Sequence, residues 1–556
     1  MTFLKRSGAP LPDHILQSAE RIRADADGMS RREFIATAST FGASAATAYG
    51  LIGLAAPTAA KAQNAQTGGT VRLRSTLRGM KDPRTFDFNA LANFSRGWLE
   101  YLVQYNNDGT FSPMLAESWD VSDDATVYTF NLRQNATWND GSPFTAEDVA
   151  FNIERFCEKG FEGNSMASRF AVIVDQDAGR LMDGVVEVVD DKTLRLNLPA
   201  PDITLIAAVS DYASAIVPQS YSADTMLTKP VGTGAYLPES YDVGVKGVLT
   251  KNPDHTYWKE DAAWLDRIEF IDYGEDPASF LAAAEADEID AIDVIEGEFV
   301  LLFDTIDGWE RHETVSAGTI LARCNQAAEV DGTTPYADPR VRKALAMAVD
   351  NSKVLELAYS GQGEPAENHH VCPIHPEYAD VGAPVFDPEG AAALMAEAGM
   401  ADFEHDLISL DAGFWRDTGD AMGAQIRDAG IKLKRTIIPS SNFWNSWDKY
   451  PFSVTNWNHR PLGIITLAIA YRSGEAWNES AYANPEFDAV VTEALQQPDV
   501  EERRELMAVA QKMMVDDGVI IQPYWRSMFN HTKTNLKGCP VHVAQEMRVA
   551  DIYWEA

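Results

Sequence analysis

The sequence predicts an α/β protein with more than one domain. Its 556 residues are too many for one hydrophobic core, since single cores stop growing beyond about 250–300 residues. Tyr128, Phe130 and Leu132 recur at every second position, which is the period of a strand with one buried face. Thr145 and Asp148 form a capping box, and apolar residues at helical spacing follow them. Two or three α/β domains are therefore expected.

Further elements are predicted on both sides of this strand and helix. Residues 68–73 are expected to form a first strand, and residues 193–198 form another half-buried strand with leucine at every second position. Asp338 and Asp387 are each followed by proline, as at a helix start with Asp as N-cap and Pro at the first position. Gly399 stands where the second of these helices would end. The α/β pattern thus extends over most of the chain.

The chain is strongly acidic. It contains 83 Asp and Glu against 46 Lys and Arg, a formal net charge of −37 at pH 7. Such a surface repels nucleic acid and anionic lipid and favours solubility, so no nucleic-acid partner is expected. The charge of a bound solute does not follow from this balance, because surface charge and pocket charge are set separately.

The N-terminus predicts an export signal. Residues 30–35 read SRREFI and resemble a twin-arginine motif, and an uncharged stretch rich in Ala, Thr and Gly continues to Ala60. A small-x-small cleavage site at residues 60–62 makes residues 1–62 the predicted twin-arginine signal peptide. The alternative, an uncleaved membrane anchor, is disfavoured because the stretch contains few Leu and Ile. We expect a periplasmic protein without a lipid anchor, since no cysteine precedes Cys157.

The chain has four cysteines, which are widely spaced and form no C-x-x-C pair. They are Cys157, Cys324, Cys372 and Cys539. In an oxidising compartment one or two disulfides are allowed, but the spacing leaves their pairing open. Twin-arginine export moves folded protein, so any bridge would have to form after translocation.

Residues 113–152 carry the most specific signal in the chain. They read PMLAESWDVSDDATVYTFNLRQNATWNDGSPFTAEDVAFN, with a Trp-containing turn, an Asp-rich bend, a strand, an Asp-Gly turn and a capped helix in that order. This block closely resembles the peptide/opine/nickel class (family 5) of extracytoplasmic solute-binding proteins, the receptor subunits of bacterial ABC importers. The alternative is one strand and one helix of an unrelated α/β protein, and the ordered run of uncommon residues argues against it.

The resemblance continues over roughly residues 68–540, and its dipeptide- and oligopeptide-binding members are the most similar. Residues 230–236 match a P-V-G-T-G-P-Y turn, with Ala235 in place of Pro. A phosphate loop is the alternative there, but no Gly-Lys-Ser/Thr follows, which favours a structural turn. The helix starts at Asp338 and Asp387, residues 482–488 and the helix through 503–514 also match the family.

The resemblance implies a two-lobed periplasmic binding protein, an α/β hinged clamshell with an extra subdomain in the first lobe. Residues 63–313 would form lobe I, with an inserted subdomain at about 113–215, and residues 314–521 would form lobe II. The chain would return to lobe I over residues 522–556, so that two or three crossing strands act as a hinge. The lobes would close on a solute without making or breaking any covalent bond.

The implied function is that of a substrate-binding receptor of an ABC transporter. It would capture a peptide or a peptide-sized solute, with an anionic, opine-like compound favoured, and deliver it as a monomer without a cofactor to permease subunits in the inner membrane. A receptor for a nickel-type metal complex and a sensory protein of the same fold are the alternatives. An enzyme is not expected, because the chain lacks a nucleophile elbow, an H-E-x-x-H motif, a P-loop and a dinucleotide fingerprint.

The segment 455–463, TNWNHRPLG, is expected to choose the cargo. In dipeptide-binding relatives the matching loop reads roughly Gly-Trp-Thr-Gly-Asp, and its Asp holds the amino terminus of the peptide. Trp457 matches the tryptophan, which puts Arg460 where that carboxylate would be, so an anionic group of the cargo is expected there. The alternative is that Arg460 points to solvent or pairs with a nearby carboxylate. Asn458 and His459 complete the predicted ligand-binding loop.

Five further ligand-binding residues are predicted from their positions relative to the family. Phe94 and Ser95 match a lobe I loop that faces the cleft in relatives, although Phe94 fits a core position equally well. Trp415 and Arg416 lie near the place of an arginine that holds a peptide carboxylate, and a solvated charge at a helix start is the alternative for Arg416. Tyr471 would add rigid aromatic contact area, unless it packs within lobe II.

The segment HHVCPIH, residues 369–375, is the one metal-binding constellation considered. His and Cys suit nickel, copper or zinc. Two prolines near the segment and its place after a G-x-G-x-P-A stretch favour a simple connection between elements, so no metal is assigned. The residues that would bind one are His369, His370, Cys372 and His375.

Overall fold

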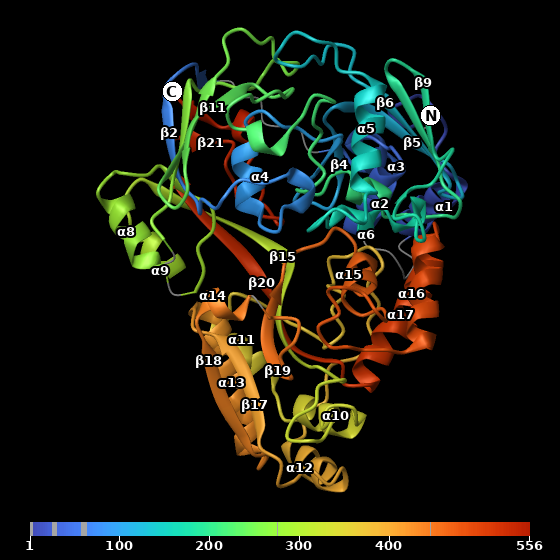
Figure 1. Ribbon diagram of the computed structural model, residues 1–556, viewed down its shortest axis with the longest axis vertical. Helices are drawn as coiled ribbons and strands as arrows, with labels where there is room; N and C mark the ends of the chain where they lie inside the picture. Colours follow the sequence, from blue (N-terminus) through green and yellow to red (C-terminus); the bar gives the residue numbers. More distant parts are fainter. Residues whose placement is uncertain (1–3, 25–30, 57–63, 275, 298, 445) are drawn as a thin grey trace. The chain divides into compact units, whose positions relative to one another are not determined.

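The computed structural model describes residues 4–24, 31–56, 64–274, 276–297, 299–444 and 446–556, which form two compact units (Figure 1). Unit 1 comprises Met1–Ile295, Phe299–Thr314 and Met528–Ala556, and unit 2 comprises Glu296–Glu298 and Val315–Ser527. The chain therefore passes between the units at four places. Two of these places lie inside continuous strands, β15 (Trp309–Cys324) and β20 (Ile520–Lys533).

Unit 1 contains a sheet with strands in the order β11 (Tyr236–Asp242), β12 (Lys246–Lys251), β13 (Arg267–Ile271), β2 (Thr70–Arg74), β14 (Ala291–Ile292) and β20. Strand β2 pairs in parallel with β13 and β14, and β14 pairs antiparallel with β20. The first strand predicted at residues 68–73 is confirmed as β2. Its Val71 and Leu73 are buried in a core that also contains Trp98 and Phe270.

A second sheet of unit 1 is antiparallel, in the order β5 (Ala116–Val121), β6 (Val127–Leu132), β10 (Thr193–Asn197) and β9 (Val186–Asp190). Tyr128, Phe130 and Leu132 are buried and alternate with half-buried neighbours, which confirms the predicted strand. Helix α5 (Ala146–Phe156) packs against β9 and β10. This sheet falls within residues 113–215, where an inserted subdomain is predicted.

The carboxylate of Asp148 ties helix α5 to the turn that precedes it. The Thr145 N–H donates to Asp148 Oδ2 at 2.9 Å, and the predicted capping box is confirmed. Trp138 Nε1 donates to the same oxygen at 3.1 Å, and Gln219 Nε2 donates to Asp148 Oδ1 at 3.2 Å. Gly141 adopts φ +87°, the left-handed conformation that the predicted Asp-Gly turn needs. One buried carboxylate therefore holds the turn, the start of the helix and the segment at Gln219 together.

The glycine-rich turn at residues 230–236 packs directly on neighbouring backbone. A Cβ at Gly232 would lie 1.8 Å from the Trp98 carbonyl oxygen, so no larger residue fits. The Gly234 N–H donates to that oxygen at 3.0 Å, and Thr233 Oγ1 donates to Glu100 Oε2 at 2.7 Å. These contacts give the turn the structural role that the sequence predicts.

The N-terminal segment forms three helices within unit 1: α1 (Asp13–Arg23), α2 (Arg31–Thr40) and α3 (Ala45–Leu51). Ser39 Oγ accepts a hydrogen bond from the Phe111 N–H at 3.0 Å, and Trp119 Nε1 donates to the Thr40 carbonyl oxygen at 3.0 Å. The predicted cleavage site at residues 60–62 lies outside the described residues. Among the helices that the structure describes, none has both the length and the apolar character to cross a membrane.

Unit 2 contains the strand order β20, β15, β19 (Phe452–Trp457), β17 (His405–Leu410) and β18 (Leu433–Ile438), with β16 (Gly363–Pro365) paired to β20. Strand β19 is antiparallel to β15 and parallel to β17. Helix α13 (Gly413–Asp428) packs on β17 and β18, and α11 (Asn351–Tyr359) packs on α13 (Figure 1). Helices α10 (Pro339–Met347) and α12 (Pro388–Glu397) pack together, as do α16 (Pro485–Gln496) and α17 (Val500–Asp516).

The helix boundaries predicted in unit 2 are confirmed. The Asp338 side chain accepts a hydrogen bond from the Arg340 N–H at 2.8 Å at the start of α10, and Asp387 accepts one from the Gly390 N–H at 2.9 Å at the start of α12. Gly399 follows α12 with φ +73°, which is the left-handed conformation that ends a helix. The helix predicted through residues 503–514 is the central part of α17.

The four cysteines are all buried, and the structure forms no disulfide between any of them. Burial raises the pKa of Cys157, Cys324 and Cys539 to about 12. At neutral pH these side chains are therefore protonated and inaccessible, and they serve as small apolar core residues.

We expect the native protein to react very slowly with a thiol reagent such as Ellman's reagent at neutral pH, because the thiolate is the reactive species. After denaturation without a reductant, four thiols per chain should titrate. A titre of two in the denatured protein would show that one disulfide forms and would contradict this assignment.

Candidate functional site

The predicted ligand-binding loop lies in unit 2, between strand β19 and helix α15 (Gly463–Ala470). Trp457 ends β19 and is paired in register with Thr319 of β15. The loop residues 458–462 then lead into α15, seven of whose eight residues are buried. The loop is thus anchored at one end by a central strand and at the other by a core helix.

A buried ion pair fixes the end of β19. Glu479 Oε2 lies 2.7 Å from Arg323 Nε, and both side chains are almost fully buried. Glu479 Oε1 accepts hydrogen bonds from Trp457 Nε1 at 2.9 Å and from Thr455 Oγ1 at 2.8 Å. Arg323 Nη1 in turn donates to Ser453 Oγ at 2.6 Å. The indole of Trp457 therefore has a defined orientation.

Trp457 belongs to a cluster of aromatic rings centred on His370. The His370 ring lies 5.5 Å from Trp457 and 6.0 Å from Trp525, and His370 Nδ1 is 2.7 Å from the Tyr471 hydroxyl. Burial, followed by the neighbouring histidines and Arg460, lowers the pKa of His370 well below its usual value. The imidazole is therefore neutral at neutral pH and bridges the two predicted residues Trp457 and Tyr471.

Arg460 is buried and has no anionic partner among the residues that the structure describes. Its side chain belongs to a residue that is only 7 % exposed, and Nη1 makes a long hydrogen bond of 3.4 Å to the His459 carbonyl oxygen. Nε is buried without a hydrogen-bond partner, and no carboxylate among the described residues lies within 4.0 Å of the guanidinium. The structure therefore shows neither a solvent-facing nor a carboxylate-paired arginine.

His459 and His375 hold the loop in place from either side of Arg460. His459 Nδ1 accepts a hydrogen bond from the Ala317 N–H at 3.0 Å, on strand β15. His375 Nδ1 accepts one from the Cys372 N–H at 3.0 Å, and its Nε2 donates to the Arg460 carbonyl oxygen at 3.0 Å. The backbone at Arg460 is thus fixed to two other segments of unit 2.

The histidines of segment 369–375 have separate roles. His370 bonds to Tyr471, His375 bonds to the loop backbone, and His369 Nδ1 accepts a hydrogen bond from the Val371 N–H at 3.3 Å. Cys372 Sγ lies 3.9 Å from the Ser316 carbonyl oxygen. Across the described part of the chain, no group of three or more His, Cys, Asp or Glu side chains has the geometry to hold a metal ion.

Phe94 and Ser95 lie in the core of unit 1, at the end of helix α4 (Asn89–Ser95). Phe94 is fully buried and its ring is within 6 Å of the rings of Trp98, Tyr241 and Phe270. Ser95 is also fully buried. Neither residue presents a surface to a solute in this structure, and their predicted ligand contact stays a prediction.

Trp415 and Arg416 lie at the start of α13, and only the tryptophan reaches β19. Trp415 Nε1 donates to Asn456 Oδ1 at 3.1 Å. The Arg416 side chain is 43 % exposed and pairs with Asp411 at 3.3 Å and Asp417 at 3.2 Å. Its guanidinium is therefore hydrated and already paired, in contrast to that of Arg460.

Three charged residues of this site were missed by sequence reasoning: Arg323, Glu479 and Glu377. Glu377 Oε1 accepts a hydrogen bond from the Ile464 N–H at 2.9 Å, at the start of α15. A tryptophan at the end of a buried strand needs an acceptor for its indole N–H, so the sequence could have predicted that Trp457 has an acceptor partner such as Glu479. Because the chain has 83 acidic residues, the sequence does not identify which of them accepts this hydrogen bond.

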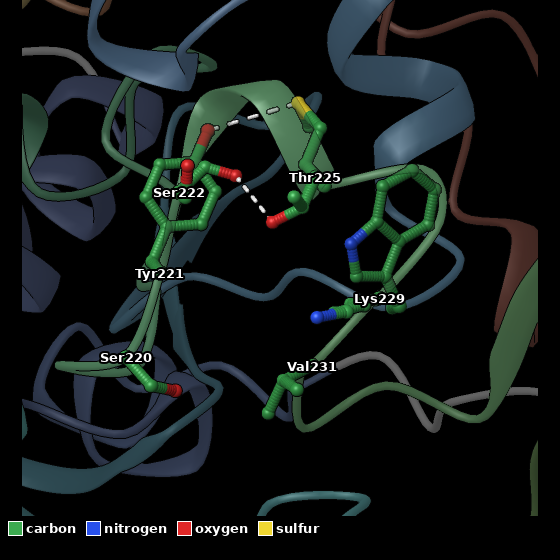
Figure 2. Close-up of a pocket in the computed structure, with 8 residues that line it drawn as sticks. Ser220, Tyr221, Ser222, Thr225, Lys229 and Val231 are labelled. Atoms are coloured by element: carbon green, nitrogen blue, oxygen red, sulfur yellow. Dashed lines mark hydrogen bonds between the residues drawn. The ribbon is translucent and has the colours of Figure 1, made fainter.

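A separate small cavity of about 190 Å³ lies in unit 1, and Figure 2 shows its lining. Thr225 Oγ1 donates to the Ser222 carbonyl oxygen at 3.4 Å on one wall. None of the predicted ligand-binding residues lines it. The lining residues are Trp98, Ser220, Tyr221, Ser222, Thr225, Met226, Lys229 and Val231.

Comparison with known proteins places the chain in a family. Residues 110–479 match the family described as bacterial extracellular solute-binding proteins, family 5 Middle. The dipeptide-binding protein DppE of Bacillus subtilis is 23% identical over 480 residues, covering 80% of this chain and 84% of DppE.

Two solved structures of binding proteins share the fold. The periplasmic binding protein DppA of Helicobacter pylori in complex with the peptide STSA has a TM-score of 0.74 at 20% identity, covering 88% of this chain and 99% of that one. AgaA of A. tumefaciens R10 in complex with agropinic acid has a TM-score of 0.75 at 22% identity, with the same coverages. The predicted two-lobed α/β fold is confirmed. The chain belongs to the bacterial extracellular solute-binding proteins of family 5.

Proposed function

We propose that this protein is the periplasmic receptor of an ABC importer, and that it captures a peptide-sized, anionic and opine-like solute for delivery to the membrane permease. Membership of family 5 supports the receptor role. The cargo class rests on one observation, the buried and unpaired guanidinium of Arg460. The relative AgaA, whose structure contains agropinic acid, is in keeping with a cargo of this kind.

An unpaired charge in a protein interior is costly, because the lost hydration is not replaced. The Arg460 guanidinium keeps its Nε without a hydrogen-bond partner among the described residues, and its planar fork of donors matches a carboxylate or a phosphate. The same charge repels an ammonium group. A bound anion would therefore supply the partner that the described residues do not.

Contacts among the crossing segments support a hinge. Arg526 Nη1 lies 2.5 Å from Glu296 Oε1, and Ser316 Oγ donates to the Arg526 carbonyl oxygen at 2.7 Å. All three residues belong to unit 2: Glu296 is the first residue after a crossing, and Ser316 and Arg526 are each one residue away from the end of the long unit 2 segment. The crossing segments are thus joined to one another where they enter unit 2. A solute that binds the closed form better than the open form would shift the equilibrium towards closure.

The proposal also covers the export of the receptor, its oligomeric state and its membrane partner. Residues 1–62 act as a twin-arginine signal peptide, the receptor works as a monomer without an enzymatic activity, and two permease subunits read its closed form. The engaged imidazoles of segment 369–375 give no support to a nickel-type receptor.

Arg460→Met is expected to weaken binding of the anionic cargo about ten- to a hundred-fold, since hydrogen bonds to a charged group contribute about 1.5–3 kcal/mol. The measurement is a thermal-shift screen followed by titration calorimetry, because a ligand that binds only the folded state raises Tm. The panel contains N-carboxyalkyl amino acids, which are opine-like, and dipeptide amides, which carry a free amine and no carboxylate.

Arg416→Met is the matched control, since it removes an exposed and already paired guanidinium. It should leave the affinity unchanged. Strong stabilisation by dipeptide amides that persists in Arg460→Met would overturn the proposed cargo class. Native mass spectrometry of protein purified without refolding would identify a retained solute directly.

A further inference from the structure

Glu377 is a second buried charge in the predicted site that lacks a full set of partners. The residue is fully buried, and one carboxylate oxygen, Oε1, accepts a hydrogen bond from the Ile464 N–H at 2.9 Å. The other oxygen, Oε2, is buried and has no hydrogen-bond partner among the described residues. Among the described residues, no lysine or arginine forms an ion pair with this carboxylate.

Helix capping accounts for only one of the two carboxylate oxygens of Glu377. Leu462, the N-cap residue of α15, has no side chain that could cap the helix, so Glu377 Oε1 takes over that task and interacts favourably with the helix dipole. An ionised carboxylate has about four acceptor positions, and buried polar atoms are nearly always satisfied. The second oxygen thus remains available for a donor that the described chain does not provide.

Glu377 and Arg460 lie on two segments that are in direct contact. His375 Nε2 donates to the Arg460 carbonyl oxygen at 3.0 Å, and two residues further on Glu377 accepts from the Ile464 N–H. Between these two contacts, a Cβ at Gly463 would lie 2.8 Å from His375 Nδ1, so the segments approach as closely as glycine allows. A buried cation and a buried carboxylate are thus presented by adjoining stretches of backbone without pairing to each other.

We infer that Arg460 and Glu377 together recognise a zwitterionic head group, in which a carboxylate binds the guanidinium and a nearby amine or ammonium N–H donates to Glu377 Oε2. The adjoining segments bring a buried cation and a buried carboxylate into one region of unit 2, which suits a solute that carries both an anionic group and an amine. An α-amino acid head group and an N-carboxyalkyl amino acid both have this arrangement. This inference rests on the proposed function and adds a specificity-determining residue to it.

The first test compares two ligands on the wild-type protein. An N-carboxyalkyl amino acid carries the carboxylate and a protonated amine, whereas its N-acetyl derivative keeps the carboxylate and loses the ammonium. Calorimetric titration should give the zwitterion at least about tenfold tighter binding, the change expected for one hydrogen bond between charged groups. This comparison needs no variant and so does not depend on whether a variant folds.

The second test uses Glu377→Gln, which retains an oxygen to cap α15 and removes the charge. It should abolish the preference for the zwitterion and leave the affinity for the N-acetyl derivative unchanged. Asp380→Asn is the matched control on the same segment, because Asp380 is exposed, and it should change neither affinity.

The possible results separate the two proposals. If both ligands bind equally and Arg460→Met weakens both, the role of Glu377 is overturned while the anionic cargo stands. If neither ligand binds the wild-type protein, the proposed cargo class fails, and the inference fails with it. A preference for the zwitterion that survives in Glu377→Gln would also refute the inference.

Discussion

Glu479→Gln is expected to lower the free energy of unfolding by about 3–5 kcal/mol, the usual cost of leaving one partner of a buried ion pair uncompensated. Arg323 would keep its charge in a fully buried position, facing an amide instead of a carboxylate. Trp457 and Thr455 could still donate to the amide oxygen, so the loss would report mainly on the charge. Urea denaturation followed by tryptophan fluorescence measures the effect.

Glu356→Gln is the control, because Glu356 forms an exposed pair with Lys353 at 2.7 Å in the same unit. Exposed pairs contribute little, so this variant should change the free energy of unfolding by less than about 1 kcal/mol. Replacing both Arg323 and Glu479 by methionine should recover part of the stability, since no buried charge then remains unpaired. A Glu479→Gln variant no less stable than the control would contradict the argument.

Glu546→Gln is expected to lower the free energy of unfolding by about 3 kcal/mol at pH 7, following the linkage between pKa and stability. In unit 1, Glu546 lies 3.0 Å from Arg96 Nη2 and 3.0 Å from Arg548 Nε. Burial alone would raise the pKa of Glu546, but the two arginines and His542 outweigh it and lower the pKa from 4.5 to about 2. The folded state thus favours the ionised form.

The direction of the pKa shift determines how the stability difference between wild type and Glu546→Gln changes with pH. Because the pKa of Glu546 is lower in the folded than in the unfolded state, its contribution is complete above about pH 4.5 and disappears as the pH falls towards 2. Wild type and Glu546→Gln should therefore differ most at pH 7 and converge in acid. Glu187→Gln, which breaks an exposed pair with Arg195, should show no such convergence. A constant difference between wild type and Glu546→Gln across this range would exclude the linkage.

Much of the fold was predictable because its signals are local. The capping box at Thr145 and the Asp-Pro starts at Asp338 and Asp387 need only a few neighbouring residues, and each forms a helix start in the structure. The crossing inside strand β20 has no such signal. Strand β20 passes from one unit to the other at Ser527 without a turn or a glycine, and its one proline, Pro523, lies before the crossing and inside unit 2.

The candidate site was predictable only in part, for a similar reason. Trp457 and Arg460 were found because they lie in one contiguous motif. The partners that define their environment are distant in sequence: Glu479 and Arg323 for Trp457, and His375 for the backbone of Arg460. Contacts of this kind are set by which strands and loops become neighbours in the fold, and a single sequence does not contain that information.

The buried thiols determine how the stability of the protein responds to the redox potential of its surroundings. A fold whose four cysteines contribute volume and not cross-links has the same stability in reducing and in oxidising surroundings. Under the proposed twin-arginine export, such a chain would fold before it crosses the membrane, and an oxidising compartment would not change its stability. Its native state is independent of redox potential, which suits a protein that would be exported already folded.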